Sequence, residues 1–326
     1  MFWKANAFNQ PIGAWNVSSV TNMGYMFYEA TAFNGDISDW EVGNVRLMFN
    51  MFAEASSFNQ NIGAWNVSSV TNMNSMFAGA SSFNQPLSEW DVSSVTGMNN
   101  TFGRASSFNQ DIGGWDVSNV TDMSFMFYNA SSFNQDISDW NVSNVTNMRY
   151  TFGRASAFNL PIGDWDVSSV TDMSAMFAGA SSFNQDIGGW DVSKVTNMGY
   201  MFYEATAFNQ DISGWCVTNI TSEPSNFSTN SALINDNKPV WETCPSLGVN
   251  DQNLMNVSLY PNPTENTLFI SGNENTIAVA IYDVLGKKVL SIKNTNTINV
   301  QALPNGVYTI RISDGVGQTN RKFIKN

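Results

Sequence analysis

Apolar residues recur along the first two thirds of the chain with a period of 25 residues. Each unit repeats nearly the same order of phenylalanine, isoleucine, tryptophan, valine and methionine, without an insertion between units. A fixed period of this length is typical of repeat proteins, whose units bury their apolar side chains only by stacking on one another. The pattern therefore predicts a solenoid of nine units over residues 1–215, with one tryptophan in each: Trp15, Trp40, Trp65, Trp90, Trp115, Trp140, Trp165, Trp190 and Trp215.

Within one unit the apolar spacing favours a short helix. Five residues follow at intervals of three, three, four and three, which would place them on one stripe of a helix: Val117, Val120, Met123, Phe127 and Ala130. Ser118 or Asp116 stands where an N-cap belongs, and the segment 133–137 has the pattern of a short strand. We therefore expect an α/β repeat solenoid, leucine-rich-repeat-like, with one short strand and one short helix in each unit.

Every unit carries an asparagine directly after its phenylalanine. An amide side chain both donates and accepts hydrogen bonds, so it can satisfy the backbone of its own turn and of the next one. We interpret these residues as a structural ladder rather than a binding site: Asn9, Asn34, Asn59, Asn84, Asn109, Asn134, Asn159, Asn184 and Asn209.

Residues 216–246 continue the repeat only in part. Trp241 is one residue out of step, but three apolar residues still fall at repeat positions: Ile220, Phe227 and Leu233. We predict a degenerate tenth unit that caps the solenoid. In an exported protein, Cys216 and Cys244 would fasten this cap by a disulfide, and two buried free thiols are the alternative.

Residues 247–326 follow a different pattern, with short β-prone runs separated by turn sequences. The turns contain Pro261-Asn262-Pro263, Leu285-Gly286-Lys287 and Pro304-Asn305-Gly306. Punctuated strands of this kind indicate a small antiparallel β-sandwich. The runs are 254–259, 267–271, 277–284, 288–292, 299–303, 306–313 and 321–324.

The composition of the chain excludes several kinds of catalytic site, metal site and partner. The chain has 27 acidic and 14 basic residues and no histidine, which removes most hydrolytic triads and zinc sites. Residues 1–253 hold 23 acids and 7 bases, whereas residues 254–326 hold 4 acids and 7 bases. This shift marks a domain boundary near residue 250, and the acidity of the repeats argues against nucleic acid as their partner.

The chain lacks the features of a membrane-spanning or leader segment. No stretch approaches the roughly 18 consecutive apolar residues of a transmembrane helix, and no basic-then-apolar signal peptide stands at the start. Met1-Phe2 is in phase with Met26-Phe27. We therefore expect the sequence to begin inside a repeat, as a fragment or a truncated product.

Two segments resemble known families. The repeat, Phe-Asn-x-x-Ile-x-x-Trp-x-Val-Ser-x-Val-x-x-Met-x-x-Met-Phe, resembles bacterial surface-protein repeats of about this length, which are relatives of BspA-like leucine-rich repeats. The tail is similar to the C-terminal sorting domain (type A) of the type IX secretion system. Its motif residues are Tyr260, Pro261, Asn262, Pro263, Gly286, Lys287, Leu303, Pro304, Gly306, Tyr308, Arg311 and Lys322.

The resemblance of the tail implies export by the type IX secretion system, with the translocon and the sortase as partners. The expected location is the surface of a Gram-negative outer membrane or the extracellular medium. Family members of this type usually lose the tail, so a cut within 245–256 would follow. An ordinary adhesive β-sandwich is the alternative for this segment.

Two columns of the repeat are candidates for ligand binding. Exposed indoles of the tryptophan column could stack on sugar rings, but we favour the interpretation that they form a core spine. Stacked carboxylates could gather calcium, but we favour a solvated turn because Pro11, Asn61, Pro86 and Pro161 interrupt the column. Its acidic members are Asp36, Asp111, Asp136, Asp186 and Asp211.

The leading functional hypothesis is a non-enzymatic cell-surface or secreted protein that binds a protein, a glycan or a host matrix through its solenoid face. A rigid array of similar units multiplies weak contacts. Outward positions at which the units differ are the candidate ligand-facing residues: Tyr28, Arg104, Tyr128, Arg154 and Tyr203.

Two other functions compete with adhesion. The solenoid could be a structural stalk or spacer that holds a missing N-terminal domain away from the cell. A glycoside hydrolase would need one pocketed pair of carboxylates, whereas nearly every acid of the repeats has counterparts in other units. We therefore expect no enzyme, no catalytic residues, no metal site and no cofactor.

Overall fold

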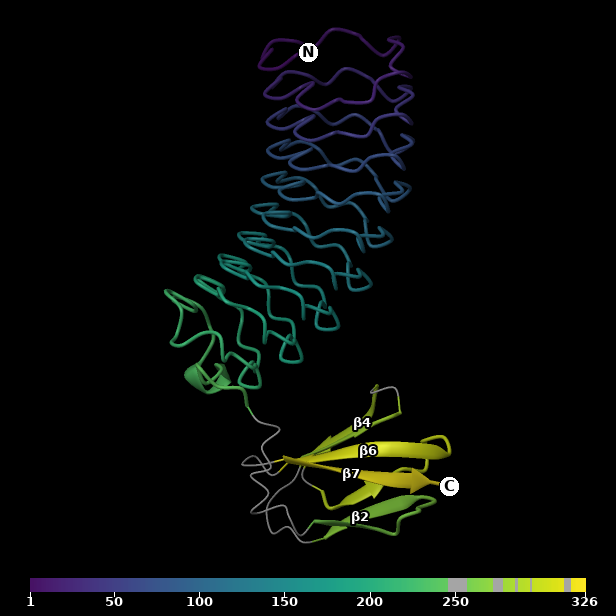
Figure 1. The fold of residues 1–326 in the computed structure, drawn as a ribbon, viewed down its shortest axis with the longest axis vertical. Coiled ribbons are helices and arrows are strands. Elements are labelled where there is room, and N and C mark those ends of the chain that lie inside the picture. The colour runs from purple at the N-terminus through teal and green to yellow at the C-terminus, as the bar shows by residue number, and fades with distance from the viewer. Residues whose placement is uncertain (246–256, 272–277, 285–286, 294, 314–317) are drawn as a thin grey trace. The chain divides into compact units, whose positions relative to one another are not determined.

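The computed structural model describes residues 1–245, 257–271, 278–284, 287–293, 295–313 and 318–326 (Figure 1). The chain divides into two compact units, Met1–Cys244 and Pro245–Asn326. We call the first unit the repeat stack and the second the tail, and we describe each by itself.

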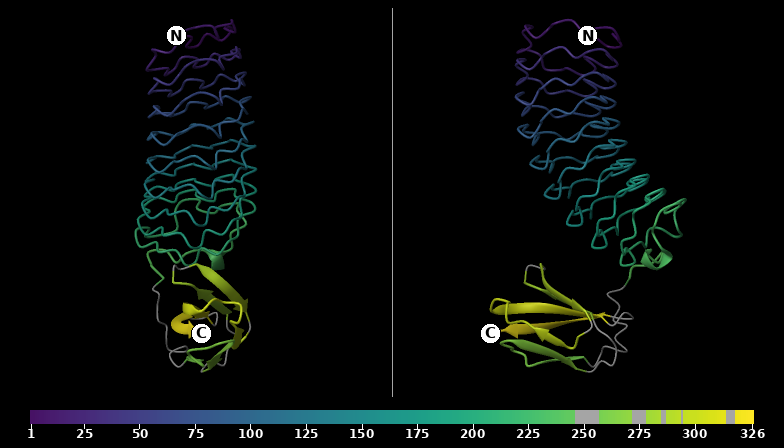
Figure 2. Two further views of the ribbon diagram at one scale, coloured as in Figure 1. Left: turned by 90° about the vertical axis from the view of Figure 1, so that its right-hand side faces the viewer. Right: turned by 180° about the vertical axis from the view of Figure 1, so that it is seen from behind.

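The repeat stack is built from turns of chain that lie one above another (Figures 1 and 2). Backbone N–H groups of one turn donate to carbonyls of the next, as from Met123 to Asn147 at 3.0 Å and from Phe127 to Thr151 at 2.9 Å. Isolated parallel bridges connect the same register in successive turns, from Asn22–Leu47 to Asp172–Asn197. Each 25-residue turn therefore satisfies much of its backbone through its neighbours.

The predicted α/β solenoid with a leucine-rich-repeat-like helix and strand in each unit is wrong. In the described residues 1–245 the one helical segment is η1, a 3-10 helix at Asn235–Asn237, and the named strands of the described chain all lie in the tail. Each turn places two residues in the left-handed region, such as Phe125 with φ 59° and Asn129 with φ 55°. A right-handed helix cannot continue through such residues.

The three-residue spacing that suggested a helix arises from β-turns. Val120 N–H donates to Val117 carbonyl oxygen at 2.9 Å, and Met126 N–H donates to Met123 carbonyl oxygen at 3.1 Å. Both ends of each turn point into the core, where these four side chains are fully buried. Residues three apart share a face in a helix and also at the two ends of a β-turn. The predicted cap residue Asp116 instead closes a local turn, because its Oδ1 accepts the Ser118 N–H at 3.0 Å.

Aromatic columns fill the core of the repeat stack. Phe102 lies 3.9 Å from Phe108 within its own turn and 5.9 Å from Phe127 in the next, measured between ring centroids. The tryptophans from Trp40 to Trp190 are 3–4% exposed, whereas Trp15 is 42% exposed. The indole N–H of Trp115 donates to the Leu87 carbonyl at 3.0 Å. The tryptophan column beyond Trp15 is therefore a core spine and presents no ring face to solvent.

The asparagine ladder runs through the whole repeat stack. The Asn84 Oδ1 accepts the backbone N–H of Asn109 and the side-chain amide of Gln110, both at 2.9 Å. The same bond from backbone N–H to Oδ1 begins at Asn9 and ends at Ile234, which donates to Asn209 at 3.0 Å. Each asparagine therefore ties its own turn to the following one.

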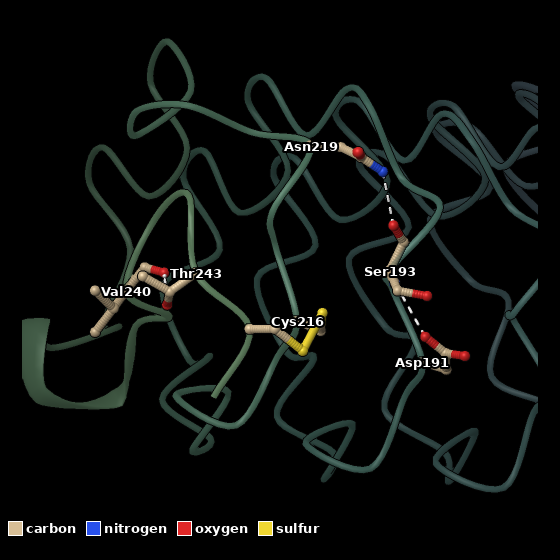
Figure 3. The surroundings of a disulfide bond; sticks show 7 residues. Asp191, Ser193, Cys216, Asn219, Val240 and Thr243 are labelled. Carbon is tan, nitrogen blue, oxygen red and sulfur yellow. Dashed lines mark hydrogen bonds between the residues drawn. A yellow bond between two sulfur atoms is a disulfide. The ribbon is translucent and has the colours of Figure 1, made fainter. Parts of the chain in front are cut away.

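Past the last repeat tryptophan the stacking continues into residues 216–244. The Phe202 N–H donates to the Phe227 carbonyl at 2.8 Å, and Trp241 meets the Phe227 ring edge-on at 4.9 Å. A disulfide joins Cys216 to Cys244 (Figure 3), which confirms the predicted pairing. The cross-link holds the end of the repeat stack against its last regular turn.

The tail consists of two antiparallel sheets. In the three-stranded sheet β2 lies between β1 and β5, and in the four-stranded sheet the order is β4-β3-β6-β7. The strands are β1 (Ser258–Tyr260), β2 (Thr267–Ser271), β3 (Ala278–Tyr282), β4 (Lys288–Lys293), β5 (Thr297–Asn299), β6 (Gly306–Ser313) and β7 (Gln318–Lys325).

Buried side chains of both sheets meet in one core. Leu268 on β2, Ile281 on β3, Ile310 on β6 and Phe323 on β7 are fully buried and belong to the same cluster. Along β2, β3 and β6, buried residues alternate with exposed or partly exposed ones, as expected for sheets with one solvated face. The expected run 254–259 lies partly outside the described residues. None of the described helices is long and apolar enough to span a membrane.

Truncation of a central indole should destabilise the repeat stack. Trp115→Ala removes a buried ring and its hydrogen bond, and we expect a loss of about 3–5 kcal/mol in the free energy of unfolding. Urea unfolding followed by circular dichroism measures it. Trp15→Ala, at the exposed end of the same column, is the control and should cost much less. Equal losses would contradict the difference in burial.

Removal of one rung of the asparagine ladder should also cost stability. Asn84→Ala leaves the Asn109 N–H and the Gln110 amide without their acceptor, and we expect a loss of about 1–2 kcal/mol in the free energy of unfolding. Asn84→Asp keeps an oxygen at the same place and should lose less. The two variants can be compared by the same urea titration, and a similar loss for both would show that the acceptor oxygen is not what matters.

Candidate functional site

The predicted ligand-facing residues occupy two adjacent positions of the repeat. Tyr28, Tyr128 and Tyr203 share one position, and Arg104 and Arg154 share the next, where the backbone is left-handed. The structure brings further aromatic side chains beside them. We call the combined surface the aromatic face, and its members are Trp3, Tyr25, Tyr28, Phe49, Phe125, Tyr128, Tyr150, Tyr200 and Tyr203.

The central cluster of the aromatic face combines three rings with one cation. Phe125 and Tyr150 stack at 5.0 Å between centroids with an interplanar angle of 15°, and Tyr128 meets Tyr150 edge-on at 5.5 Å. The Arg149 guanidinium lies 5.7 Å from the Phe125 centroid and 5.5 Å from the Tyr150 centroid. These contacts hold partly exposed side chains in place, with a positive charge available beside them.

Two outer clusters repeat the arrangement without the cation. Trp3 stacks on Tyr25 at 5.1 Å, and Phe49 meets Tyr25 edge-on at 5.2 Å. Tyr200 meets Tyr203 edge-on at 5.7 Å. Trp3 is 56% exposed and Tyr200 is 43% exposed, so both clusters offer apolar surface to solvent.

Six of these nine aromatic residues were not predicted from the sequence, although a signal for them was present. The position of Tyr150 and Tyr200 holds asparagine, serine or alanine in other units, such as Asn100, Ser75 and Ala175. An aromatic residue at a position that tolerates small polar ones is not required for the core. Comparison of the units at every outward position would have found the whole face.

The two predicted arginines have different surroundings. Arg104 forms an ion pair with Glu54, two units away. The pair passes over Gly79, where φ is +70° and a Cβ would lie 2.5 Å from the Glu54 carboxylate. Glycine therefore makes room for this bridge. Arg154 lies against Gly179, whose Cβ would come within 3.1 Å of the Arg154 Cγ.

Carboxylates flank two of the predicted tyrosines. A hydrogen bond with the Glu29 side chain raises the pKa of Tyr28, and one with the Glu204 side chain raises the pKa of Tyr203. Both phenols therefore remain neutral at physiological pH and keep their hydrogen-bonding protons.

Hydrogen bonds link some of the motif residues of the tail in pairs. The Asn262 side chain donates to the Lys322 carbonyl at 3.1 Å and accepts the Ile324 N–H at 2.9 Å, which ties the Pro-Asn-Pro segment to β7. The Tyr308 hydroxyl donates to the Pro304 carbonyl at 2.8 Å. Gly286 lies outside the described residues.

A groove of about 460 Å³ lies over the four-stranded sheet of the tail. Arg311 and Lys322 line it, and the Arg311 guanidinium lies 5.2 Å from the Tyr282 ring centroid. The motif residues thus build turns and one cationic surface rather than a site with a nucleophile and a base.

Family models match both units. The family described as "Mycoplasma protein of unknown function, DUF285" matches three overlapping segments, 1–82, 59–160 and 135–241. The chain belongs to the DUF285 family. The model of the secretion system C-terminal sorting domain matches residues 258–326. The BspA-like relationship of the DUF285 repeats stays a prediction.

The sorting domain determines where this DUF285 protein goes. Chains with this domain are handled by the type IX secretion system, so the protein is secreted to the cell surface or the extracellular space. The location predicted from the tail sequence is thereby confirmed. The translocon and the sortase as individual partners remain predictions.

Similarity to individual proteins is limited. No curated protein matches the chain. Among solved structures, the chain is similar to one of PorZ, described as "an essential bacterial surface component of the type-IX secretion system of human oral-microbiomic Porphyromonas gingivalis". The identity is 21%, the TM-score is 0.21, and the match covers 26% of this chain and 13% of that chain.

The acidic column of the DUF285 repeats lies in solvated turns. Each predicted member is exposed, and its Oδ1 accepts the N–H two residues later, at 3.0 Å for Asp36 and 2.9 Å for Asp111. The same turn bond occurs at Asp136, Asp186 and Asp211. Among the described residues no three acidic or cysteine side chains are placed to hold a metal ion. The expectation that no metal or cofactor is bound, with calcium as the alternative, stays untested.

A second acidic column gives the repeats a dependence on pH. Hydrogen bonds from the Ser118 hydroxyl and backbone N–H lower the pKa of Asp116. Serine hydroxyls and N–H groups act in the same way on Asp91, Asp166 and Asp191. A carboxyl whose pKa is lower in the folded state stabilises the fold above its unfolded pKa of about 4. That contribution is lost as pH falls through the folded pKa.

The sequence itself supplies the variant that tests this dependence. Asn16, Asn66 and Asn141 occupy the same repeat position and keep the acceptor oxygen. We expect the variant with Asp91, Asp116, Asp166 and Asp191 changed to asparagine to melt near the wild-type temperature at pH 7. It should lose less stability than the wild type between pH 5 and about 2. Calorimetry across this range measures the melting temperatures of the wild type and the variant. Parallel pH profiles would contradict the lowered pKa of these four carboxyl groups.

Proposed function

We propose that this secreted DUF285 protein is a non-enzymatic adhesin that binds its ligand through the aromatic face. The observation that carries the proposal is the central cluster of Phe125, Tyr128 and Tyr150 with Arg149. These side chains are half-buried or exposed and lie outside the core column. Aromatic residues and arginine are the side chains that most often dominate the binding energy of interfaces.

The backbone beneath the aromatic face supports the proposal. Phe125 N–H donates to the Arg149 carbonyl at 2.8 Å, and Tyr150 N–H donates to the Ser174 carbonyl at 3.0 Å. The residues that carry the rings are therefore linked from turn to turn. A surface held in this way loses little conformational entropy on binding.

The non-enzymatic part of the proposal rests on repetition and composition. Both matching families are of non-catalytic kinds. The chain has no histidine, and the carboxylates of the acidic columns lie in equivalent turns. A catalytic site needs one pocketed constellation of groups that differs from its surroundings.

The binding test uses the full chain on an array of matrix proteins and glycans. In one variant, Phe125→Asn, Tyr128→Ala and Tyr150→Asn replace the rings by residues that occupy the same positions in other units. We expect micromolar binding by the wild type and at least a tenfold loss in the variant, because the central aromatic contacts are removed.

Asp111→Asn is the matched control. Asp111 lies outside the aromatic face, and Asn61 occupies the equivalent position in another unit. It should bind as the wild type does. Binding that survives loss of the central cluster would place the ligand elsewhere. An absence of binding to any array member at micromolar concentration would favour the spacer hypothesis.

A further inference from the structure

A cleft of about 570 Å³ opens on the surface of the repeat stack near its C-terminal end. Its walls include Tyr150 and Tyr200, and Ser174, Ala175 and Asn197 line it between them. Tyr150, Ala175 and Tyr200 occupy the equivalent position in three successive units, and residues of the next turn, within 219–225, complete the lining. In the middle unit this position holds Ala175 in place of an aromatic residue.

The spacing of the two tyrosines leaves room for one flat ring between their registers. They occupy the same register two units apart, which corresponds to about 10 Å of parallel backbone spacing. Ala175 is the residue at this register in the unit between them, and it is buried. Two van der Waals contacts of about 3.5–4.0 Å fit within that spacing.

The orientation of Tyr150 is determined by its neighbours. One face of its ring stacks on Phe125 of the preceding unit, with an interplanar angle of 15°. The other face therefore points along the stack toward Ala175. Edge-on contacts with Tyr128 on one wall and between Tyr200 and Tyr203 on the other keep both walls in place.

The rim of the cleft is polar and carries one positive charge. Arg149 is the single charged residue among those that line it, in a chain of net charge −13. The Ser174 side chain is buried, and its Oγ has no hydrogen-bond partner in the structure. Buried hydroxyls are usually paired, so the Ser174 Oγ is an unpaired polar atom beneath the lining of the cleft, whereas the exposed Asn197 amide faces solvent.

We infer that this cleft binds one ring of an acidic saccharide, with the apolar faces of the sugar on Tyr150 and Tyr200 and its carboxylate on the Arg149 guanidinium. The inference rests on the proposed adhesive function and names its ligand class. A pyranose ring has apolar faces and a rim of hydroxyl groups, which matches the two aromatic rings and the exposed Asn197 amide between them. A guanidinium binds a carboxylate through two parallel hydrogen bonds.

The test is calorimetric titration of the full chain with trisaccharides of galacturonate, glucuronate and mannuronate. Their methyl esters keep the rings and remove the charge. We expect at least one acid to bind tenfold or more tightly than its ester. Arg149→Asn should abolish this preference, and Tyr200→Ala should weaken the acid and the ester alike by at least tenfold. Asn99 and Ala175 already occupy these two positions in other units.

Asp111→Asn is the control, since Asp111 lies outside the aromatic face and outside the cleft, and Asn61 occupies the equivalent position in another unit. It should leave both affinities unchanged. Equal binding of acid and ester, absence of binding at millimolar concentration, or an equal loss of affinity in the Asp111 variant would overturn the inference. If one of these results is found while array ligands still bind through the central cluster, the proposed adhesive function is supported and only the saccharide site is disproved.

Discussion

The repeat stack depends on hydrogen bonds and ring contacts between successive turns. A single turn has neither an α-helix nor a strand ladder of its own, and beyond its local β-turns many of its backbone bonds run to the turns on either side, as from Phe127 to Thr151. The phenylalanine columns and the tryptophan spine follow the same direction. The free energy of folding of such a stack is a sum of contributions from each unit and from each interface between neighbouring units. A unit is therefore ordered only when the adjacent units are ordered.

This dependence separates core positions from surface positions within every unit. Phenylalanine, valine, methionine and tryptophan recur because each must match its counterparts in the turns above and below. The left-handed positions and the residue before the second of them, such as Phe125, Tyr128 and Asn129, lie outside this core cluster. They can therefore hold different residues in different units, among them tyrosine, asparagine, alanine and glycine. Differences between units at these positions create the aromatic face and the cleft without any change in the backbone.

The tail differs from the repeat stack in how it is stabilised and in its charge. Its two antiparallel sheets are completed within a single copy, and its core joins residues far apart in the sequence. It carries more basic than acidic residues, whereas the repeats are strongly acidic. On the four-stranded sheet, Arg311 and Lys322 line a groove beside Tyr282.

The sequence by itself determined the register of the repeats and the likeness of the tail to a sorting domain, because periodicity and motif order are properties of the chain. It left Cys216 and Cys244 as either a disulfide or two free thiols, and the structure shows the disulfide. It did not determine the local conformation, since a three-residue spacing fits both a helix and consecutive β-turns. The tertiary structure decided between them through left-handed residues such as Phe125 and Asn129. Only stacking brings Tyr150 and Tyr200 to opposite walls of one cleft, because residues fifty positions apart become neighbours when the turns lie on one another.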